Sequence, residues 1–99
     1  MRGEIQSIGE IVEAMVSRLG LKQKIKRARV VHHWPRLVGE IIARETRAER
    51  VRGDSLFVTT SSPVWAQELE LMKPKLLKKI REEIGKGVIS DIRFKTGPI

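Results

Sequence analysis

Cysteine is absent from this chain of 99 residues, aromatic residues make up only 4% of it, and long apolar runs are missing. Without cysteine, neither a disulfide framework nor a thiolate metal site can form. No apolar stretch approaches the roughly 20 residues that a membrane-spanning helix needs. The first residues, M-R-G-E-I-Q-S-I-G-E, contain no apolar segment of the kind that secretory signals have. We therefore expect a cytoplasmic protein.

Catalytic motifs are also absent. The sequence has no Walker-type glycine loop, no nucleophile elbow and no zinc-binding helix signature. His32 and His33 are neighbours on a predicted helix, where successive side chains point about 100° apart and chelate one ion poorly. Glu82 and Glu83 stand at a predicted helix end and are typical of solvated charge. We therefore expect a protein that is not an enzyme and that takes no metal, cofactor or small-molecule substrate.

Basic residues outnumber acidic ones by 20 to 12, which gives a formal net charge of +8. Two segments contain no acidic residue at all. The first basic cluster is Lys22, Lys24, Lys26, Arg27 and Arg29, and the second basic cluster is Lys73, Lys75, Lys78, Lys79 and Arg81. Such unneutralised charge favours phosphates, because each neutralised phosphate releases counterions. A nucleic acid is the favoured partner, ahead of an acidic protein surface or an anionic membrane, and a solvated helix face is the alternative for either cluster.

Four further arginines are interleaved with acids rather than separated from them. They are Arg44, Arg47, Arg50 and Arg52, and the acids between them are Glu45 and Glu49. We interpret these residues as mutually paired surface charges.

Two helical segments are predicted in the first half of the chain. Apolar residues recur every three or four positions over residues 4–19, which predicts an amphipathic helix that Gly20 ends in the left-handed conformation. This apolar stripe consists of Ile5, Ile8, Val12, Met15 and Leu19. A second periodic segment covers residues 21–42. Pro35 lies inside it, and because proline lacks an amide hydrogen and clashes with the preceding turn, we expect a kink or a break near His33–Trp34.

The hydrophobic period then changes to that of strands. Strands are predicted near 47–52, where Val51 lies among charged neighbours, and near 55–61, where Leu56 and Val58 share one face. Gly53-Asp54 between them suits a type II′ hairpin turn. Ser62 and Pro63 start a helix, since serine caps free amides and proline loses no hydrogen bond at the first position. A third strand is predicted near 88–95.

The helix that begins at Pro63 carries Pro74 in its interior, and its division into two helices is one expected outcome. Its apolar face includes Trp65 and Leu69, which we expect to be buried. The sheet residues expected to contact them are Leu56, Val58 and Ile92. Trp34 also continues an apolar stripe, so core packing is predicted for it as well.

The predicted order is helix, helix, strand, strand, helix, strand, in a single domain of residues 1–99. The fold class is α/β in the α+β sense. A three-stranded sheet with helices on one face is the economical way to bury these apolar stripes.

Phe57 has the opposite parity to Leu56 and Val58 on its predicted strand. With helices on one face of the sheet only, Phe57 would be exposed beside Arg93 and Lys95, where a nucleobase could stack on it. Burial in a dimer interface, or under the amino-terminal helix, is an alternative of equal weight. Candidate nucleic-acid-binding residues are therefore the two basic clusters together with Phe57, Arg93 and Lys95.

Residues spread over about positions 30–96 resemble one protein family, the DciA-like proteins, which are bacterial factors that act on the replicative DNA helicase. The matching residues are Trp34, Val38, Gly39, Leu56, Val58, Ser61, Ser62, Trp65, Ala66, Gln67, Glu68, Leu69, Ile92, Arg93 and Phe94. The resemblance implies that Gly39 permits a close helix approach. It also implies a KH-like fold, a type of nucleic-acid-binding domain.

A typical KH domain grips the nucleic-acid backbone with a G-x-x-G loop between two helices. This sequence has no such loop, and the corresponding break would be Met72-Lys73-Pro74-Lys75. Proline flanked by lysines could present charge to a phosphate, but it does not allow the close backbone approach that glycine permits.

The resemblance implies a non-enzymatic DNA-replication accessory protein. It would bind DNA, single-stranded or fork-like, and the hexameric replicative helicase, and would assist helicase loading. The alternatives are a KH-like, ribosome-associated RNA-binding module and a protein-interaction adaptor with a basic face. Many family members carry a flexible tail, whereas this sequence stops just after its last predicted strand. We therefore expect either that the folded domain acts alone or that the chain is a truncated form.

Overall fold

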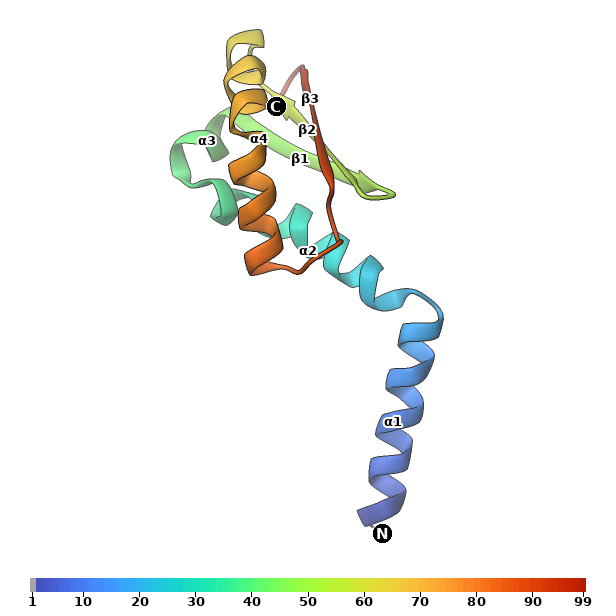
Figure 1. Ribbon diagram of the computed structural model, residues 1–99. Helices are drawn as coiled ribbons and strands as arrows, with labels where there is room; N and C mark the ends of the chain where they lie inside the picture. Colours follow the sequence, from blue (N-terminus) through green and yellow to red (C-terminus); the bar gives the residue numbers. More distant parts are fainter. Residues whose placement is uncertain (1) are drawn as a thin grey trace.

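A computed structural model describes residues 2–99, with the side chains of residues 7–15 and 17–99. It shows a mixed α+β fold (Figure 1). The elements are α1 (Arg2–Arg18), α2 (Leu21–Val38), α3 (Glu40–Glu45), β1 (Thr46–Arg52), β2 (Ser55–Thr60), α4 (Pro63–Glu83) and β3 (Asp91–Thr96). The predicted α+β class and KH-like layout are confirmed, with one helix more than predicted.

The extra helix arises at Gly39, not at Pro35. Helix α2 runs through Pro35 to Val38, so the predicted break near His33–Trp34 is wrong. A proline removes only one helical hydrogen bond, and the helix is anchored by buried Trp34 and Leu37 on either side of it. Gly39 has φ 87° and ψ 166°, a conformation essentially restricted to glycine, and it separates α2 from α3.

Gly39 therefore serves a different purpose from the expected close approach of helices. A Cβ built on Gly39 would meet no atom within 4 Å. Its backbone conformation, not a lack of space, is what demands glycine.

The sheet has the order β1-β2-β3, with β1 antiparallel and β3 parallel to the central strand β2. Gly53 has φ 62°, and no described residue other than glycine has a positive φ. Asp54 therefore has a negative φ, which fits the predicted type II′ turn. A bulge at Glu49 shifts the register between Ala48 and Arg50.

Helix α4 begins at the predicted capping residues and runs without interruption to Glu83. The Ser62 hydroxyl accepts a hydrogen bond of 3.2 Å from the Trp65 amide, and Pro63 is the first helical residue. The helix is not divided at Pro74. Leu69, on one side of this proline, and Leu76, on the other, are both buried in the core, so packing favours a continuous helix through the proline.

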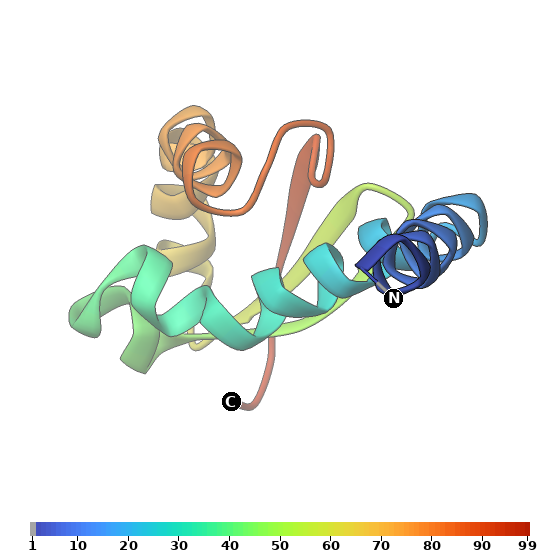
Figure 2. The same ribbon diagram turned by 90° about the horizontal axis from the view of Figure 1, so that it is seen from below.

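The core lies between the sheet and the helices α2 and α4, which cover the same face of the sheet (Figure 2). Its fully or nearly fully buried apolar residues are Val30, Trp34, Leu37, Leu56, Val58, Leu69, Leu76, Ile80, Val88, Ile89 and Ile92. Trp34 is in the core as predicted. Trp65 is only half-buried and packs against the margin of the core, so its predicted burial is corrected. Strand β3 starts at Asp91, later than predicted, because Val88 and Ile89 enter the core from a loop.

Helix α1 extends away from the sheet as an arm, and the molecule measures 60 × 23 × 22 Å (Figure 1). Gly20, with φ 71° and ψ 16°, joins α1 to α2 in the predicted left-handed conformation. Ile8 and Met15 of the predicted apolar stripe are 62% and 50% exposed, whereas the side chain of Ile5 lies outside the described ones. Within the described part of the chain, no helix combines the length and apolar character that spanning a membrane would require.

Candidate nucleic-acid interface

The face of the sheet opposite the core carries Phe57 between two arginines. Strand pairing places Arg50 of β1 and Arg93 of β3 directly beside it. The guanidinium carbons of Arg50 and Arg93 lie 4.9 Å and 6.0 Å from the centre of the Phe57 ring. Cations at such distances are attracted to the ring face. We refer to these three residues as the Arg–Phe–Arg row.

Phe57 is half-buried, not exposed as one of the two alternatives had it. Its position beside Arg93 matches the expectation. Helix α1 points away from the sheet in Figure 1, so this helix is not what shields the ring. The two arginine side chains lie against the Phe57 ring instead. The ring therefore restricts the positions of their guanidinium groups and is not an open surface for base stacking.

Arg50 belongs to the candidate interface, although its sequence neighbours Glu45 and Glu49 predict a paired surface charge. Neither Arg50 nor Arg52 forms a salt bridge with any described residue. The hairpin sequence indicates the true neighbour of Arg50. Counting back from a two-residue turn at Gly53-Asp54 places Arg50 close to Phe57, and the register pairs the two residues.

Arg47 does form the predicted pair with an acid. Its guanidinium lies 3.0 Å from a Glu49 carboxylate oxygen, and the Thr59 hydroxyl donates a hydrogen bond of 3.0 Å to the same oxygen. The hydrogen bond from Arg47, followed by that from Thr59, lowers the pKa of Glu49. The charge of Arg47 is therefore paired with that of Glu49, whereas the side chain of Lys95 is exposed.

The first basic cluster lies on α2, where its members face different surroundings. Lys22 is 3.2 Å from Glu13 of α1. Arg29 lines a polar hollow with His33, Arg36, Glu83 and Ile84. Lys26 and Arg27 are half-buried, whereas Lys24 is exposed. The structure thus divides this cluster among separate surfaces.

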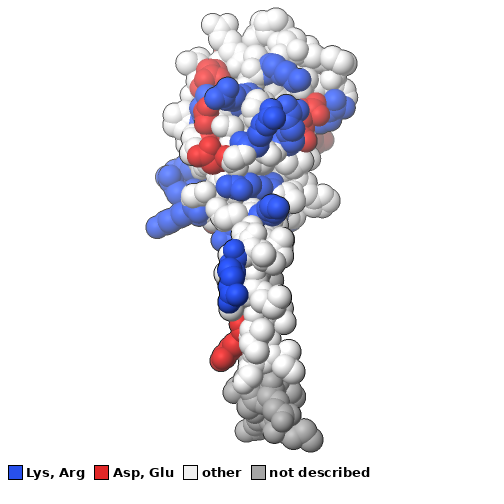
Figure 3. All heavy atoms as spheres, turned by 90° about the vertical axis from the view of Figure 1, so that its right-hand side faces the viewer, with Lys and Arg blue, Asp and Glu red and all other residues white. Residues whose placement is uncertain are grey.

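A hollow between α2 and β1 joins part of this cluster to the sheet. Its volume is about 410 Å³, and its lining residues are Lys24, Arg27, Ala28, Val31, Arg50 and Val51. We call it the α2–β1 hollow. Arg50 belongs both to the lining of this hollow and to the Arg–Phe–Arg row, so this residue links the two surfaces. Figure 3 shows the lysine and arginine side chains over the folded part and at the start of the arm, with fewer acids among them.

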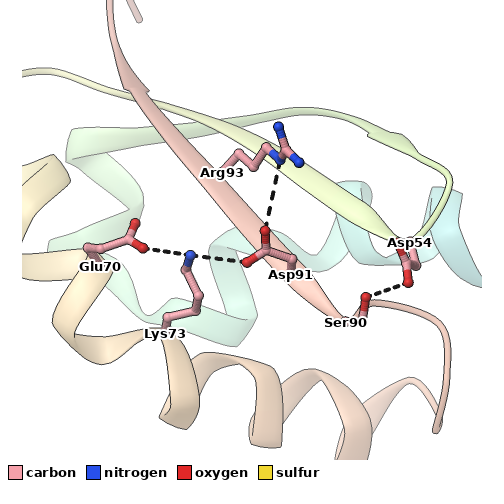
Figure 4. Close-up of polar contacts among 6 residues, drawn as sticks. All are labelled: Asp54, Glu70, Lys73, Ser90, Asp91 and Arg93. Carbon is pink, nitrogen blue, oxygen red and sulfur yellow. Dashed lines mark hydrogen bonds and ion pairs between the residues drawn. The ribbon is translucent and has the colours of Figure 1, made fainter.

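The second basic cluster lies on α4, and its member Lys73 forms ion pairs with two acidic residues. Its ammonium nitrogen lies 2.6 Å from Glu70 and 3.0 Å from Asp91 of β3 (Figure 4). The hydrogen bond to Glu70, together with that to Asp91, raises the pKa of Lys73, and the hydrogen bond from Lys73 lowers the pKa of Asp91. Arg93 approaches the same Asp91 at 3.8 Å. Lys73 therefore links α4 to the sheet.

The other members of the second basic cluster remain at the surface. Lys78 lies 3.9 Å from Glu82. Exposed members without an ion pair to any described residue are Lys75, Lys79 and Arg81. The expected break at Met72-Lys73-Pro74-Lys75 does not exist, since α4 is continuous there. This part of the chain presents side chains, and no loop backbone, to a partner.

A different surface surrounds Trp65. A hollow of about 530 Å³ is lined there by Val38, Gly39, Glu40, Ile41, Ile42 and Trp65. Ile41 is 66% exposed. The indole of Trp65 thus faces this mainly apolar hollow, which explains why it is not fully buried.

His32 and His33 lie with their ring centres 5.3 Å apart and their planes at 74°. In the described part of the chain, no group of three or more histidine, cysteine, aspartate or glutamate side chains is arranged to hold a metal ion.

A small basic α+β domain of KH-like layout, with arginines on the open face of its sheet, is the class of protein that this fold defines. The sequence matches the family described as "Dna[CI] antecedent, DciA" over residues 7–94. The chain belongs to the DciA family, as the resemblance of its residues suggested.

Curated relatives agree with this assignment. A UPF0232 protein of Corynebacterium glutamicum (strain R) is 33% identical over 89 residues, which is 90% of this chain and 50% of the relative. One from Rhodococcus jostii (strain RHA1) is 32% identical over 93 residues, 94% of this chain and 49% of the relative. A UPF0232 protein of Mycobacterium leprae (strain TN) is 30% identical over 93 residues, which is 94% of this chain and 49% of the relative. The chain spans about half the length of these relatives.

Proposed function

We propose that this chain is a non-enzymatic DNA-replication accessory protein that binds nucleic acid and the replicative DNA helicase and assists helicase loading. Membership of the DciA family over residues 7–94 is the observation that carries the proposal. The sequence has no ATP-binding motif. Any loading activity then draws on binding energy or on the nucleotide cycle of the helicase itself.

The nucleic-acid part of the proposal is supported by the arrangement of cations. Lys24 and Arg27 of α2 meet Arg50 at the α2–β1 hollow, and Arg50 continues to Phe57 and Arg93 across the sheet. A net charge of +8 on so small a domain attracts polyanions and speeds encounter. We expect single-stranded or fork DNA to be bound with little sequence preference, because phosphate contacts carry no sequence information.

The experiment that tests this part compares single-stranded DNA, duplex DNA and structured RNA at one salt concentration. Tighter binding of single-stranded or forked DNA supports the proposal. Preference for structured RNA favours a ribosome-associated RNA-binding module, which the KH-like layout also permits. Absence of binding to all three at low salt favours an adaptor that meets an acidic protein.

The helicase part is tested by a pull-down of the cognate hexameric helicase with the tagged chain. A variant in which Lys24 and Arg50 are both replaced by glutamine serves as a matched control, because it alters the proposed nucleic-acid surface only. Nuclease treatment of both samples removes bridging by DNA. Retention of the helicase by the nuclease-treated wild type is the expected result, and its absence contradicts the proposal.

A further inference from the structure

The α2–β1 hollow combines two chemical characters. Its lining consists of three basic residues, Lys24, Arg27 and Arg50, and three apolar residues, Ala28, Val31 and Val51, which we call the apolar floor. A simple anion would need only the basic residues. A ligand that fills the whole hollow has a negatively charged group attached to a less polar body, as a nucleotide has.

Arg27 provides a second, independent observation. Its Nε atom is buried and forms no hydrogen bond with any described residue. Buried donors almost always have a partner, and an unpaired one is costly. Arginine presents its N–H groups in a planar fork that matches phosphate oxygens. Since Nε itself is closed to solvent, a ligand oxygen in the hollow would accept from the outer N–H groups of this half-buried guanidinium.

Arg50 connects the hollow to the sheet. Its guanidinium lies 4.9 Å from the centre of the Phe57 ring, which restricts where the long side chain can point. On the other side of Phe57, the guanidinium carbon of Arg93 in β3 lies 6.0 Å from the centre of the same ring. Adjacent strands lie about 4.8 Å apart, so Arg50 on β1 and Arg93 on β3 stand about two strand spacings apart, on either side of Phe57.

Among macromolecules, a single strand of nucleic acid fits this arrangement better than a duplex or an acidic peptide. Its phosphates can follow the row of cations, and an unstacked base or sugar can lie on the apolar floor. In a duplex, the bases are stacked inside and cannot reach the floor. A carboxylate peptide brings one charge per acidic side chain but no planar apolar body beside it.

We propose that the α2–β1 hollow binds one nucleotide unit of a single-stranded nucleic acid, with its phosphate between Lys24, Arg27 and Arg50, and that Phe57 is a positioning residue for Arg50. This inference rests on the proposed nucleic-acid binding and gives it a location. The strand then continues over Arg93, which shares Asp91 with Lys73 of the second basic cluster, and Lys73 itself is held by Glu70 and Asp91.

The experiment measures binding of a fluorescein-labelled mixed-sequence single strand of about 20 nucleotides, a length beyond the usual site of one small domain. Fluorescence anisotropy is recorded between about 50 and 200 mM salt. The main variant replaces Lys24 and Arg50 by glutamine, because both are exposed and the fold does not depend on them. The matched control replaces Lys79 and Arg81, two exposed cations of α4, by glutamine.

Removal of a charge-assisted hydrogen bond weakens binding about tenfold. We therefore expect the variant of Lys24 and Arg50 to bind at least about tenfold more weakly than wild type, with a log–log salt slope lower by about 0.7 for each phosphate that is no longer neutralised. The control variant is expected to change affinity less than the main variant. Arg27→Gln is measured in parallel, with its circular dichroism, because this side chain is half-buried.

Phe57 is tested by its coupling to Arg50. Phe57→Leu keeps an apolar side chain but removes the ring face, and it is expected to weaken binding several-fold, whereas Phe57→Trp is expected to restore it. In the Arg50→Gln background, Phe57→Leu should have no further effect on affinity. Equal effects of Phe57→Leu with and without Arg50 would overturn the positioning role.

Three results would overturn the location while leaving the proposed function standing. The first is wild-type affinity and salt slope in the variant of Lys24 and Arg50. The second is competition by duplex DNA as effective as that by unlabelled single strand. The third is displacement of the strand by poly-glutamate at equal charge, which would identify a general carboxylate site. If wild type itself binds no nucleic acid, the proposed function fails first.

Discussion

The indole Nε1–H of Trp34 donates a hydrogen bond of 2.9 Å to the hydroxyl oxygen of Thr46, and both residues are buried. The Thr46 hydroxyl in turn donates a hydrogen bond of 2.8 Å to the carbonyl oxygen of Ile42. One hydroxyl thus satisfies the only polar group of the core tryptophan side chain and a carbonyl in α3. Through it, helix α2 is connected to the first residue of β1.

Thr46→Val is expected to destabilise the fold by about 1–3 kcal/mol, because the shape is kept while a buried N–H and a carbonyl lose their partner. Urea unfolding followed by tryptophan fluorescence measures the change. Trp34→Phe in the Thr46→Val background provides the control, since the orphaned N–H is then absent. If Thr46→Val costs as much in the Trp34→Phe background as it does beside the native indole, the hydrogen bond is not its cause.

Leu69→Ala is expected to cost about 2–5 kcal/mol, as deletions of buried leucines do, since Leu69 is 0% exposed. Trp65→Ala should cost less than the about 3–5 kcal/mol typical of a fully buried aromatic residue, because the indole lines the hollow beside α3 and is only half-buried. Equilibrium unfolding of the two variants measures both losses of stability and shows which one is larger. A greater destabilisation by Trp65→Ala would show that its packing, not its exposure, dominates.

The sequence predicted the elements whose determinants are local. Ser62, Pro63 and the Trp65 amide form the helix cap that their residue types indicated, and Gly53-Asp54 set the hairpin register. Pro35 and Pro74 do not interrupt their helices as local rules predict, because tertiary burial decides whether a helix continues past a proline. Residues on both sides of Pro35 and Pro74 are fixed in one core, and local rules contain no information about that core.

Positions of charged side chains were harder to predict, because they depend on contacts between distant segments. Lys73 lay in an acid-free stretch of sequence, yet Asp91 reaches it from β3. Arg50 lay among acids, yet it turns to Phe57 and to the α2–β1 hollow. Acid content within a segment therefore does not measure neutralisation in space, whereas strand register would have placed Arg50 correctly.

Asp91→Asn is expected to reduce stability at neutral pH and to have little effect in acid. Lys73 lowers the pKa of Asp91 below its ordinary value of 3.8, so this contribution is present above that value and is lost as the pH falls through the lowered pKa. Since the Asp91 side chain is 42% exposed, solvent screening limits the effect to about 0.2–1 kcal/mol.

Urea unfolding of wild type and Asp91→Asn at several pH values measures this difference. A difference that persists unchanged below the ordinary pKa of aspartate would contradict the ion pair as its source. Lys73 offers the opposite test, because its pKa is raised above 10.5. Its contribution is complete below that value and is lost only as the pH rises through the raised pKa.

Replacement of Lys75, Lys78 and Lys79 by glutamine tests the second basic cluster apart from Lys73, which the fold itself uses. If α4 binds phosphates beside the α2–β1 hollow, the log–log salt slope of DNA binding should fall by about 0.7–0.9 for each phosphate that these lysines neutralise. Unfolding should be nearly unchanged, because these side chains lie at the surface. Unchanged affinity and slope would identify α4 as a solvated face and leave nucleic-acid binding to α2 and the sheet, whereas a weakening greater than that of the Lys24 and Arg50 variant would move the principal contact to α4.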